Sequence, residues 1–399
     1  MSPLLSVEDL TVHFAVRRGF GKRSADVVHA ADEVSLAIEP GQTVALVGES
    51  GSGKTTVARA ILQLSKPTGG RIVFQGNDIG SLKRAQKRAA MSDAQVVFQD
   101  PYSSLSPRLT VHDVIAEPLR AQSRLSGKEL NQRILSLLEM VGLGTQHLWR
   151  RPHEFSGGQC QRIAIARALA LEPKLIVLDE PTSALDVSVQ ARILVLLKDL
   201  QKRLGPAYLF IAHDLAVVES ISDRVAVMYL GQIVESGPTE AVLHDPRHPY
   251  TRALLASVPS PDPRLRSELG IIAGEVPSAV RPPSGCRFHP RCPFVMDVCP
   301  AEEPPLRDIG GGRRVACHLA DDFVFAPVVR PAGGDGASAL SSAAADGQTD
   351  SGNPAEADVP PLGRTMKEAL FGTRRRARLV PGAMLDRSRE GQGTGGTER

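Results

Sequence analysis

The glycine-rich segment at residues 48–56 constrains the fold more than any other feature of the chain. It follows an apolar run at Thr43–Val47, precedes a helical pattern at Lys54–Leu64, and reads Gly48-Glu49-Ser50-Gly51-Ser52-Gly53-Lys54-Thr55-Thr56. Glycines let backbone N–H groups curl around phosphate oxygens, and the helix N-terminus adds a favourable dipole. Lys54 can reach the β- and γ-phosphates, and the Thr55 hydroxyl can ligate Mg²⁺. We therefore expect a nucleotide site, with kinases, GTPases and ATPases still open.

Short apolar runs alternate with helical patterns over residues 1–255. The expected strands are Val34–Ile38, Thr43–Val47, Arg71–Phe74, Gln95–Phe98, Lys174–Leu178 and Tyr208–Ala212. The expected helices are Lys54–Leu64, Lys128–Val141, Gly158–Leu171 and Val187–Leu204. Such interleaving predicts an α/β domain with a mostly parallel sheet. Residues 101–170 are mainly helical and interrupt the strands, which predicts an inserted helical subdomain.

The composition changes twice beyond residue 255. Proline becomes frequent over 256–325, where periodicity is weak, so this region needs support beyond a core of its own. Residues 331–360 contain no Lys, Arg or aromatic residue, which predicts a disordered linker. We therefore expect a separate C-terminal region at 256–325, followed at 326–399 by a disordered linker and a basic tail.

Composition also excludes several classes of protein. Lys+Arg number 47 and Asp+Glu 44, so 47 − 44 gives a net charge of +3, too small to indicate nucleic-acid binding by itself. No apolar stretch approaches the ~18 residues that a membrane span needs. The first residues lack the pattern of a secretory signal. We expect neither an integral membrane protein nor a secreted one, so that another subunit must supply any attachment to a membrane.

Two adjacent acids end the apolar run Lys174–Leu178. Asp179, at the strand end, would hold Mg²⁺ through water, and Glu180 would face the γ-phosphate. A carboxylate placed there can orient and deprotonate the attacking water. Two acids after an apolar run are also common at solvated strand ends, and only the glycine-rich segment makes this pair a hydrolytic site.

A second glycine-rich helix start lies at Ser156-Gly157-Gly158-Gln159, before an Ala-rich helical pattern. Ser156 is placed to cap this helix, and the two glycines leave backbone N–H groups free for phosphate. One nucleotide site does not need two such helix ends. The motif is useful if it closes on a nucleotide held by another chain.

In this order, the motifs resemble those of the ATP-binding cassette family, over about 250 residues. Gly48–Thr56 resembles the Walker A motif, Leu175–Glu180 the Walker B motif and Ser156–Gln159 the signature motif. The resemblance implies a P-loop ATPase core in which Gln99 senses Mg²⁺ and the attacking water, Ser183–Asp186 form the D-loop, and His213 contacts the γ-phosphate. Phe14 aligns more loosely with the aromatic residue that stacks on adenine, where most members have tyrosine; a core position is the alternative. Because Lys54, Gln99, Glu180 and His213 are all present, we expect a competent half-site.

Three further segments resemble the oligopeptide, dipeptide and nickel importers of this family: Phe98–Arg108, His248–Leu255 and Pro283–Pro293. The resemblance implies an ATP-hydrolysing subunit that energises di- and oligopeptide import. Its implied partners are a second ATPase subunit (a copy or a paralogue), two membrane permease subunits and an extracytoplasmic substrate-binding protein. It would sit peripherally on the cytoplasmic side of the inner membrane.

Four of the five cysteines fall within the C-terminal region, at Cys286, Cys292, Cys299 and Cys317. Without a secretory signal, such a group indicates metal ligation before disulfides. Structural zinc usually shows closely spaced C-x2–4-C pairs, which are missing here, and four thiolates suit a [4Fe–4S] cluster. The resemblance to peptide importers points the same way. Zn²⁺ and unligated thiols are the alternatives, with His289 and His318 as substitute ligands.

Two other functions remain open at this point. A nickel or other small-solute importer would share the same ATPase mechanism and differ only in cargo. A soluble cassette ATPase acting on nucleic acid belongs to another class. The single cassette and the near-neutral charge argue against it.

Overall fold

A large central sheet forms the body of the computed structural model, which describes residues 2–17, 25–123, 125–257 and 274–320. Its strand order is β11-β12-β10-β9-β3-β8-β7-β6. The strands β9, β3, β8, β7 and β6 are parallel, and β10, β12 and β11 extend the sheet in antiparallel fashion. In chain order the strands are β3 (Thr43–Val47), β6 (Ala94–Val97), β7 (Leu175–Asp179), β8 (Ala207–Ala212), β9 (Arg224–Tyr229), β10 (Gln232–Pro238), β11 (Arg307–Gly310) and β12 (Arg313–Val315). All residues of β3, β7 and β8 are buried, as expected for parallel strands covered on both faces.

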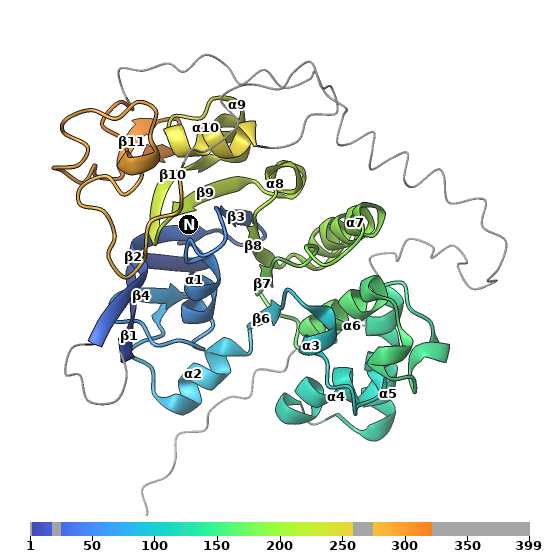
Figure 1. Cartoon of the computed structure of the whole chain (residues 1–399). Coiled ribbons are helices and arrows are strands. Elements are labelled where there is room, and N and C mark those ends of the chain that lie inside the picture. The colour runs from blue at the N-terminus through green and yellow to red at the C-terminus, as the bar shows by residue number, and fades with distance from the viewer. Residues whose placement is uncertain (1, 18–24, 124, 258–273, 321–399) are drawn as a thin grey trace, which may run out of the picture. The chain divides into compact units, whose positions relative to one another are not determined.

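A second, antiparallel sheet has the order β2-β1-β4-β5. Its strands are β1 (Leu5–Arg17), β2 (Ala25–Ile38), β4 (Gly69–Phe74) and β5 (Asn77–Asp78). The helix α1 (Lys54–Ile61) lies between the two sheets (Figure 1). The main core joins all three, because apolar residues of β1, β2, β4 and α1 cluster with Leu46, Val177 and Leu209 of the central sheet.

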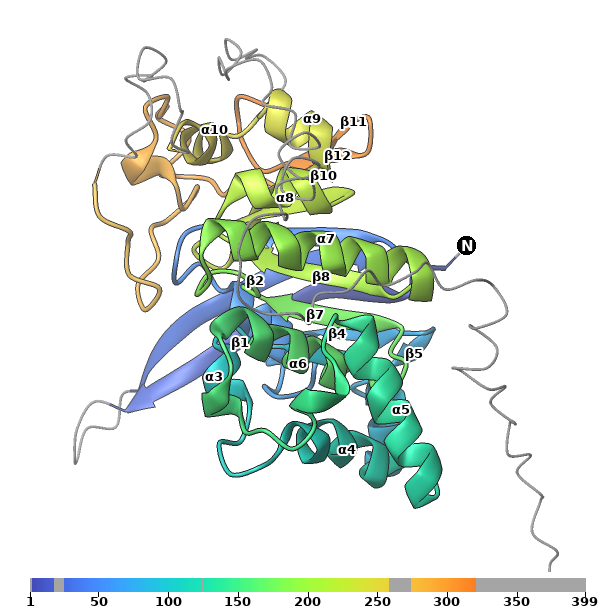
Figure 2. The same cartoon turned by 90° about the vertical axis from the view of Figure 1, so that its right-hand side faces the viewer.

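Helices cover the other face of the central sheet. The long helix α7 (Val187–Leu204) runs along β8 (Figure 2) and buries Ile193, Leu194, Leu197 and Leu200. The remaining helices outside the 101–170 block are α2 (Arg84–Met91), α8 (Leu215–Ile221), α9 (Thr239–His244) and α10 (Pro249–Ala256). None of the described helices is both long and apolar enough to cross a bilayer.

The block over residues 101–170 is helical, as the sequence predicts. It contains α3 (Pro101–Ser104), α4 (Val111–Gln122), α5 (Gly127–Met140), α6 (Gly157–Leu169) and the short 3-10 turns Thr145–His147 and Pro152–Glu154. These helices pack on one another and lie beyond the β6 and β7 edge of the sheet (Figures 1 and 2).

Several elements differ from the sequence prediction. The strand expected at Val34–Ile38 begins earlier, at Ala25, and pairs with β1, which runs from Leu5 to Arg17; residues 18–24 lie outside the described part. The strands β9 and β10 were not predicted.

The C-terminal region is attached to the central sheet, because β12 pairs with β10. The predicted disordered linker and basic tail (326–399) lie outside the described residues.

Candidate functional site

The phosphate-binding loop connects β3 to α1, as the glycine-rich motif predicts. Gly53 has φ +106, and a Cβ atom there would lie 2.0 Å from the Ala30 carbonyl oxygen. Only glycine fits so strained and crowded a position. The buried Lys54 ammonium donates to the carbonyls of Gly48 (2.7 Å) and Glu49 (2.8 Å), which places a cation inside the loop.

A cavity of about 550 Å³ opens in front of this loop. Its lining combines the loop with residues of β2, the ends of the central strands and one C-terminal residue: Val28, Ala30, Ser50, Gly51, Gly53, Lys54, Thr55, Thr56, Gln99, Glu180, His213 and Ala279. The volume suits a nucleotide-sized ligand.

Asp179 and the loop meet at the end of β7. The Thr55 hydroxyl donates to Asp179 Oδ1 at 3.2 Å, so the two expected Mg²⁺ ligands are neighbours. Burial raises the pKa of Asp179, and the hydrogen bond from Thr55 acts in the opposite direction. Burial likewise lowers the pKa of Lys54, while the nearby carboxylates, Glu180 first, raise it. A buried carboxylate beside a lysine suits a site for a cation and a polyanion.

The side chains of two other predicted residues, Gln99 and His213, lie next to the Glu180 carboxylate. Gln99 Nε2 donates to Glu180 Oε2 at 2.9 Å, and His213 Nδ1 lies 3.4 Å from the same oxygen. Each residue follows a different parallel strand: Gln99 comes after β6, Glu180 after β7 and His213 after β8. The carboxyl ends of these strands therefore bring Gln99, Glu180 and His213 to one edge of the sheet.

The segment Ser156–Gln159 begins α6 within the helical block. Ser156 Oγ accepts from the Gln159 backbone N–H at 3.4 Å, and the Gln159 side chain accepts from Ser156 N at 3.1 Å, so the predicted cap is present. Ser156 is exposed, and Leu185 of the D-loop packs beside Gly157. Among the described residues that line the cavity, none comes from this motif.

Phe14 lies on β1 and is 42% exposed, so the alternative of a core position is wrong. It pairs with Val28 across the β1–β2 hairpin, and Val28 lines the cavity. Phe14 therefore lies next to the lining of the cavity.

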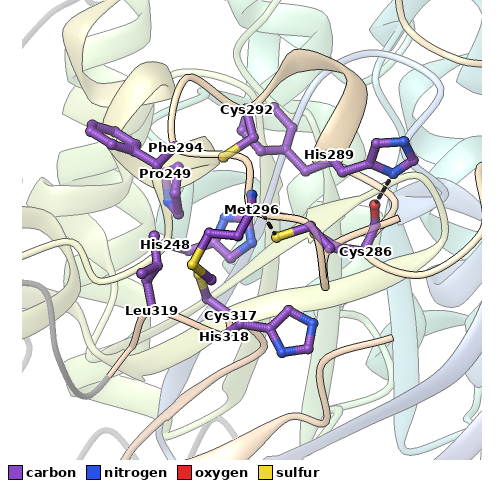
Figure 3. A pocket seen from close by; sticks show the side chains of 12 residues that line it. His248, Pro249, Cys286, His289, Cys292, Phe294, Met296, Cys317, His318 and Leu319 are labelled. Carbon is purple, nitrogen blue, oxygen red and sulfur yellow. Dashed lines mark hydrogen bonds between the residues drawn. The ribbon is translucent and has the colours of Figure 1, made fainter. Parts of the chain in front are cut away.

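Cys286, Cys292, Cys299 and Cys317 line one small cavity together with His248, His289 and His318 (Figure 3). Burial raises the pKa of Cys286 to about 12 and that of Cys292 to about 11. Both thiols are therefore neutral as long as no metal ion is bound. His289 Nδ1 donates to the Cys286 carbonyl (2.9 Å), and His318 Nε2 donates to the Glu302 carbonyl (3.0 Å). The structure thus brings the four cysteines of the sequence prediction to one place.

The spacing of the sulfur atoms bears on what they could hold. In a tetrahedral zinc site with Zn–S bonds of about 2.3 Å, the sulfurs lie ~4 Å apart. In the part of the chain that the structure describes, only His13, His29 and Asp32 bring three possible ligand atoms within 4.8 Å of one another. The four cysteines are not part of that group. Their cavity of about 10 Å³ would have to open further to take a larger group.

His13, His29 and Asp32 form a cluster that the sequence did not suggest. Asp32 accepts from His13 and lies 3.2 Å from His29 Nδ1, while Arg287 Nη2 pairs with the same carboxylate at 2.5 Å. The positive charge of Arg287 opposes a cation here. We interpret the cluster as an ion-pair network between the C-terminal region and β2.

Sequence reasoning also missed two partners of the phosphate-binding loop. Arg291 pairs with the Glu49 carboxylate, and Tyr250 Oη accepts from Glu49 N. Arg291 lies 242 residues from Glu49, and no local pattern signals such a contact.

Comparisons with protein families agree with this site. Residues 31–183 match the family described as ABC transporter, and residues 234–299 match the family described as oligopeptide/dipeptide transporter, C-terminal region. The second match contains Cys286, Cys292 and Cys299.

Individual proteins extend the similarity over most of the described chain. A protein of Sinorhizobium fredii named as a probable peptide ABC transporter ATP-binding protein is 53% identical over 79% of this chain and 90% of its own length. The oligopeptide transport ATP-binding protein OppF of Escherichia coli is 49% identical over 76% of this chain and 92% of its own. Among solved structures, the dimeric ATP-binding cassette MJ0796 bound to ADP and Pi matches with a TM-score of 0.52 at 31% identity, over 59% of this chain and 98% of that one.

Proposed function

Because the chain belongs to the ATP-binding cassette family of ABC transporters, and because Gln99 and His213 converge on Glu180 beside the phosphate-binding loop, we propose that it is the ATP-hydrolysing subunit of a peptide importer. The convergence on Glu180 carries the enzymatic part of the proposal. The importer class rests on the C-terminal family match and on relatives named for peptide or oligopeptide transport. Residues 1–255 form the nucleotide-binding part, and 256–325 the importer-type C-terminal region.

The phosphate-binding loop Gly48–Thr56 holds the ATP phosphates through its backbone N–H groups and Lys54. Thr55, Asp179 and Gln99 are placed to hold Mg²⁺, which when bound neutralises the phosphate charge. Glu180 accepts a hydrogen bond from the attacking water and takes up its proton. His213 lies 3.4 Å from Glu180 and lines the same cavity as the phosphate-binding loop, where it would contact the γ-phosphate. Phe14 lies beside the adenine.

A second ATPase subunit completes the site. Ser156–Gln159 form an exposed helix start away from the chain's own phosphate cavity, so this motif closes on ATP held by the partner. A structural relative of this cassette is described as dimeric with ADP and Pi. Closure of the two cassettes on ATP moves the membrane permease subunits, and hydrolysis reopens them.

The partners follow from the importer class. They are two permease subunits and an extracytoplasmic substrate-binding protein that delivers the peptide. The chain then lies peripherally on the cytoplasmic face of the inner membrane, held by the permeases. A nickel or other small-solute cargo is the alternative within the same mechanism.

The test is ATP hydrolysis by the chain purified with its copurifying membrane proteins, with Glu180→Gln as the comparison. We expect stimulation by a peptide-loaded binding protein, and loss of hydrolysis with retention of ATP binding in Glu180→Gln. Stimulation by a nickel-loaded binding protein alone would change the cargo. Hydrolysis without membrane partners, or stimulated by DNA, would overturn the transport function.

The four cysteines hold a metal group that stabilises the fold of the C-terminal region, and a [4Fe–4S] cluster is favoured over Zn²⁺. The donors are soft thiols that converge from four separate points of the chain, and the C-x2–4-C pairs typical of structural zinc are missing from the sequence. The residues that would ligate the cluster are Cys286, Cys292, Cys299 and Cys317. The group is structural, because it lies among apolar and aromatic side chains rather than in the phosphate cavity.

Metal analysis of anaerobically purified full-length chain tests this assignment. Four irons and four sulfides per chain, lost in Cys286→Ser and kept in Cys160→Ser, are expected; Cys160 is the matched control because it is buried in α6, outside this group. One zinc per chain would replace the cluster with the alternative. Absence of any bound metal would contradict both.

A further inference from the structure

Arg291 of the C-terminal region contacts the phosphate-binding loop at Glu49. The Glu49 carboxylate accepts from Arg291 through two bonds, Nη1 at 2.9 Å and Nη2 at 3.3 Å. The Glu49 backbone N–H donates to Tyr250 Oη at 2.8 Å. The side chain of Arg291 is only 6% exposed and that of Glu49 is 25% exposed, so water screens the pair weakly. The C-terminal region thus holds the side chain of this loop residue through Arg291, and Tyr250 of α10 holds its backbone.

Arg291 is itself fixed by a rigid turn. It ends the 3-10 turn His289–Arg291, and its N–H donates to the Phe288 carbonyl at 2.9 Å. Phe288 is buried, with ring centroids 5.2 Å from Tyr229 and 5.4 Å from Tyr250. The Arg291 guanidinium also lies 5.9 Å from the centre of the Tyr229 ring. This aromatic cluster anchors the turn on β9 and α10, which makes Arg291 a preorganised cation.

The charge of Glu49 explains why the loop needs that cation. The loop gathers N–H groups to receive a polyanion, yet Glu49 places a carboxylate within it. Lys54 neutralises the phosphates, but its ammonium donates to the loop carbonyls of Gly48 and Glu49 rather than to the Glu49 carboxylate. A bidentate arginine neutralises that carboxylate and fixes its direction at once.

We infer that Arg291 is a positioning residue for ATP: by neutralising Glu49 and holding the phosphate-binding loop, it makes the ATP affinity of the cassette depend on the C-terminal region. The inference rests on the ATP binding given under Proposed function. It adds a contribution from residues outside the cassette motifs. Arg291 directly precedes Cys292, so the residue that contacts the phosphate-binding loop is next in sequence to one of the four cysteines.

The test is the dissociation constant of ATP, measured by calorimetry on the full-length chain with four variants. Arg291→Gln leaves the Glu49 carboxylate without its counter-charge. We expect ATP to bind about tenfold more weakly, because this carboxylate then repels the ATP phosphates in a partly screened site. Glu49→Gln removes the charge, so the double variant Glu49→Gln/Arg291→Gln is expected to bind within about threefold of wild type. Arg291→Lys keeps the charge but not the fork, and is expected to fall in between. In the assembled transporter the change is expected in KM, with kcat retained.

Arg287→Gln is the matched control. Arg287 belongs to the same segment and also makes a largely buried ion pair, with Asp32 instead of Glu49. We expect it to lower the unfolding temperature without weakening ATP binding. Weakening as large as in Arg291→Gln, or failure of Glu49→Gln to rescue Arg291→Gln, would overturn the inference. A wild-type chain that binds no ATP would instead overturn the proposed function.

Discussion

Glu180 has a backbone conformation that glutamate rarely adopts. Its φ of +46 lies in the left-handed region, which costs a non-glycine residue about 1–2 kcal/mol. Its N–H donates to the Ile211 carbonyl of β8 at 3.1 Å, and this bond holds the turn in place. The turn directs the carboxylate away from β7 and toward Gln99 and His213. The strained turn therefore places the Glu180 carboxylate beside Gln99 and His213 at the edge of the sheet.

His213 gives the sharpest residue-scale prediction. We expect His213→Ala to lower ATP hydrolysis by about 100-fold in the assembled transporter, because the group that faces the γ-phosphate and contacts Glu180 is lost. His244→Ala is the control, since His244 on α9 is 57% exposed against 58% for His213 and also faces a glutamate, Glu219. The measurement is the steady-state rate at saturating ATP. Equal rates in the two variants would contradict the role of His213.

Two helices of the 101–170 block begin with the same local structure. At α6, Ser156 Oγ accepts from Gln159 N, and at α5, Ser126 Oγ accepts from Glu129 N, both at 3.4 Å. In each case the third helical residue reaches back to the capping N–H. The caps are thus structurally equivalent. A glycine follows the serine in both, and the segments first differ at the second and third helical residues, which are Gly158 and Gln159 in α6 but Lys128 and Glu129 in α5.

This pair of helices separates capping from ATP binding. Ser156→Ala and Ser126→Ala are each expected to lower stability by about 1 kcal/mol, because each leaves one helix N–H unpaired. Only Ser156→Ala is expected to reduce ATP hydrolysis, since we propose that Ser156 belongs to the surface that closes on the partner's ATP. Denaturant unfolding gives the first quantity and the rate of the assembled transporter the second. A similar loss of rate in Ser126→Ala would show that the effect is only structural.

The parts of the site that follow strands could be predicted from sequence. Thr43–Val47 and Leu175–Asp179 are apolar runs that end in chemistry-bearing residues, and parallel strands carry such residues to one edge. The strand β9 was not predicted, although five of its six residues, Val225–Tyr229, are apolar or aromatic and buried. The pair Arg291–Glu49 could not be predicted, because a contact between charges 242 residues apart in the chain leaves no periodic pattern.

At the scale of the whole molecule, one buried ion pair ties the C-terminal region to the cassette. Glu235 on β10 is fully buried and pairs with Arg313 of β12 at 3.0 Å. It also accepts from the backbone N–H groups of Arg247 and His248, so its oxygens are well satisfied. Burial raises the pKa of Glu235, and these hydrogen bonds act in the opposite direction. Attachment of β12 to the sheet therefore depends on the Arg313 guanidinium, which neutralises the buried Glu235 carboxylate.

Arg313→Met removes that compensation, and Arg314→Met, at the exposed neighbouring position of β12, is its control. We expect Arg313→Met to lose about 3 kcal/mol of stability, because an unpaired carboxylate is left in the core. An acid whose pKa is raised by folding takes up a proton on folding, so its contribution to stability falls as pH rises above its ordinary value of 4.5.

Without Arg313 the pKa of Glu235 rises further, and the deficit of Arg313→Met relative to wild type is therefore expected to be larger at about pH 8 than at about pH 5.5. Denaturant unfolding of the full-length chain at both pH values measures it. A deficit that shrinks as pH rises, or an equal loss in Arg314→Met, would show that Glu235 does not hold this edge of the sheet.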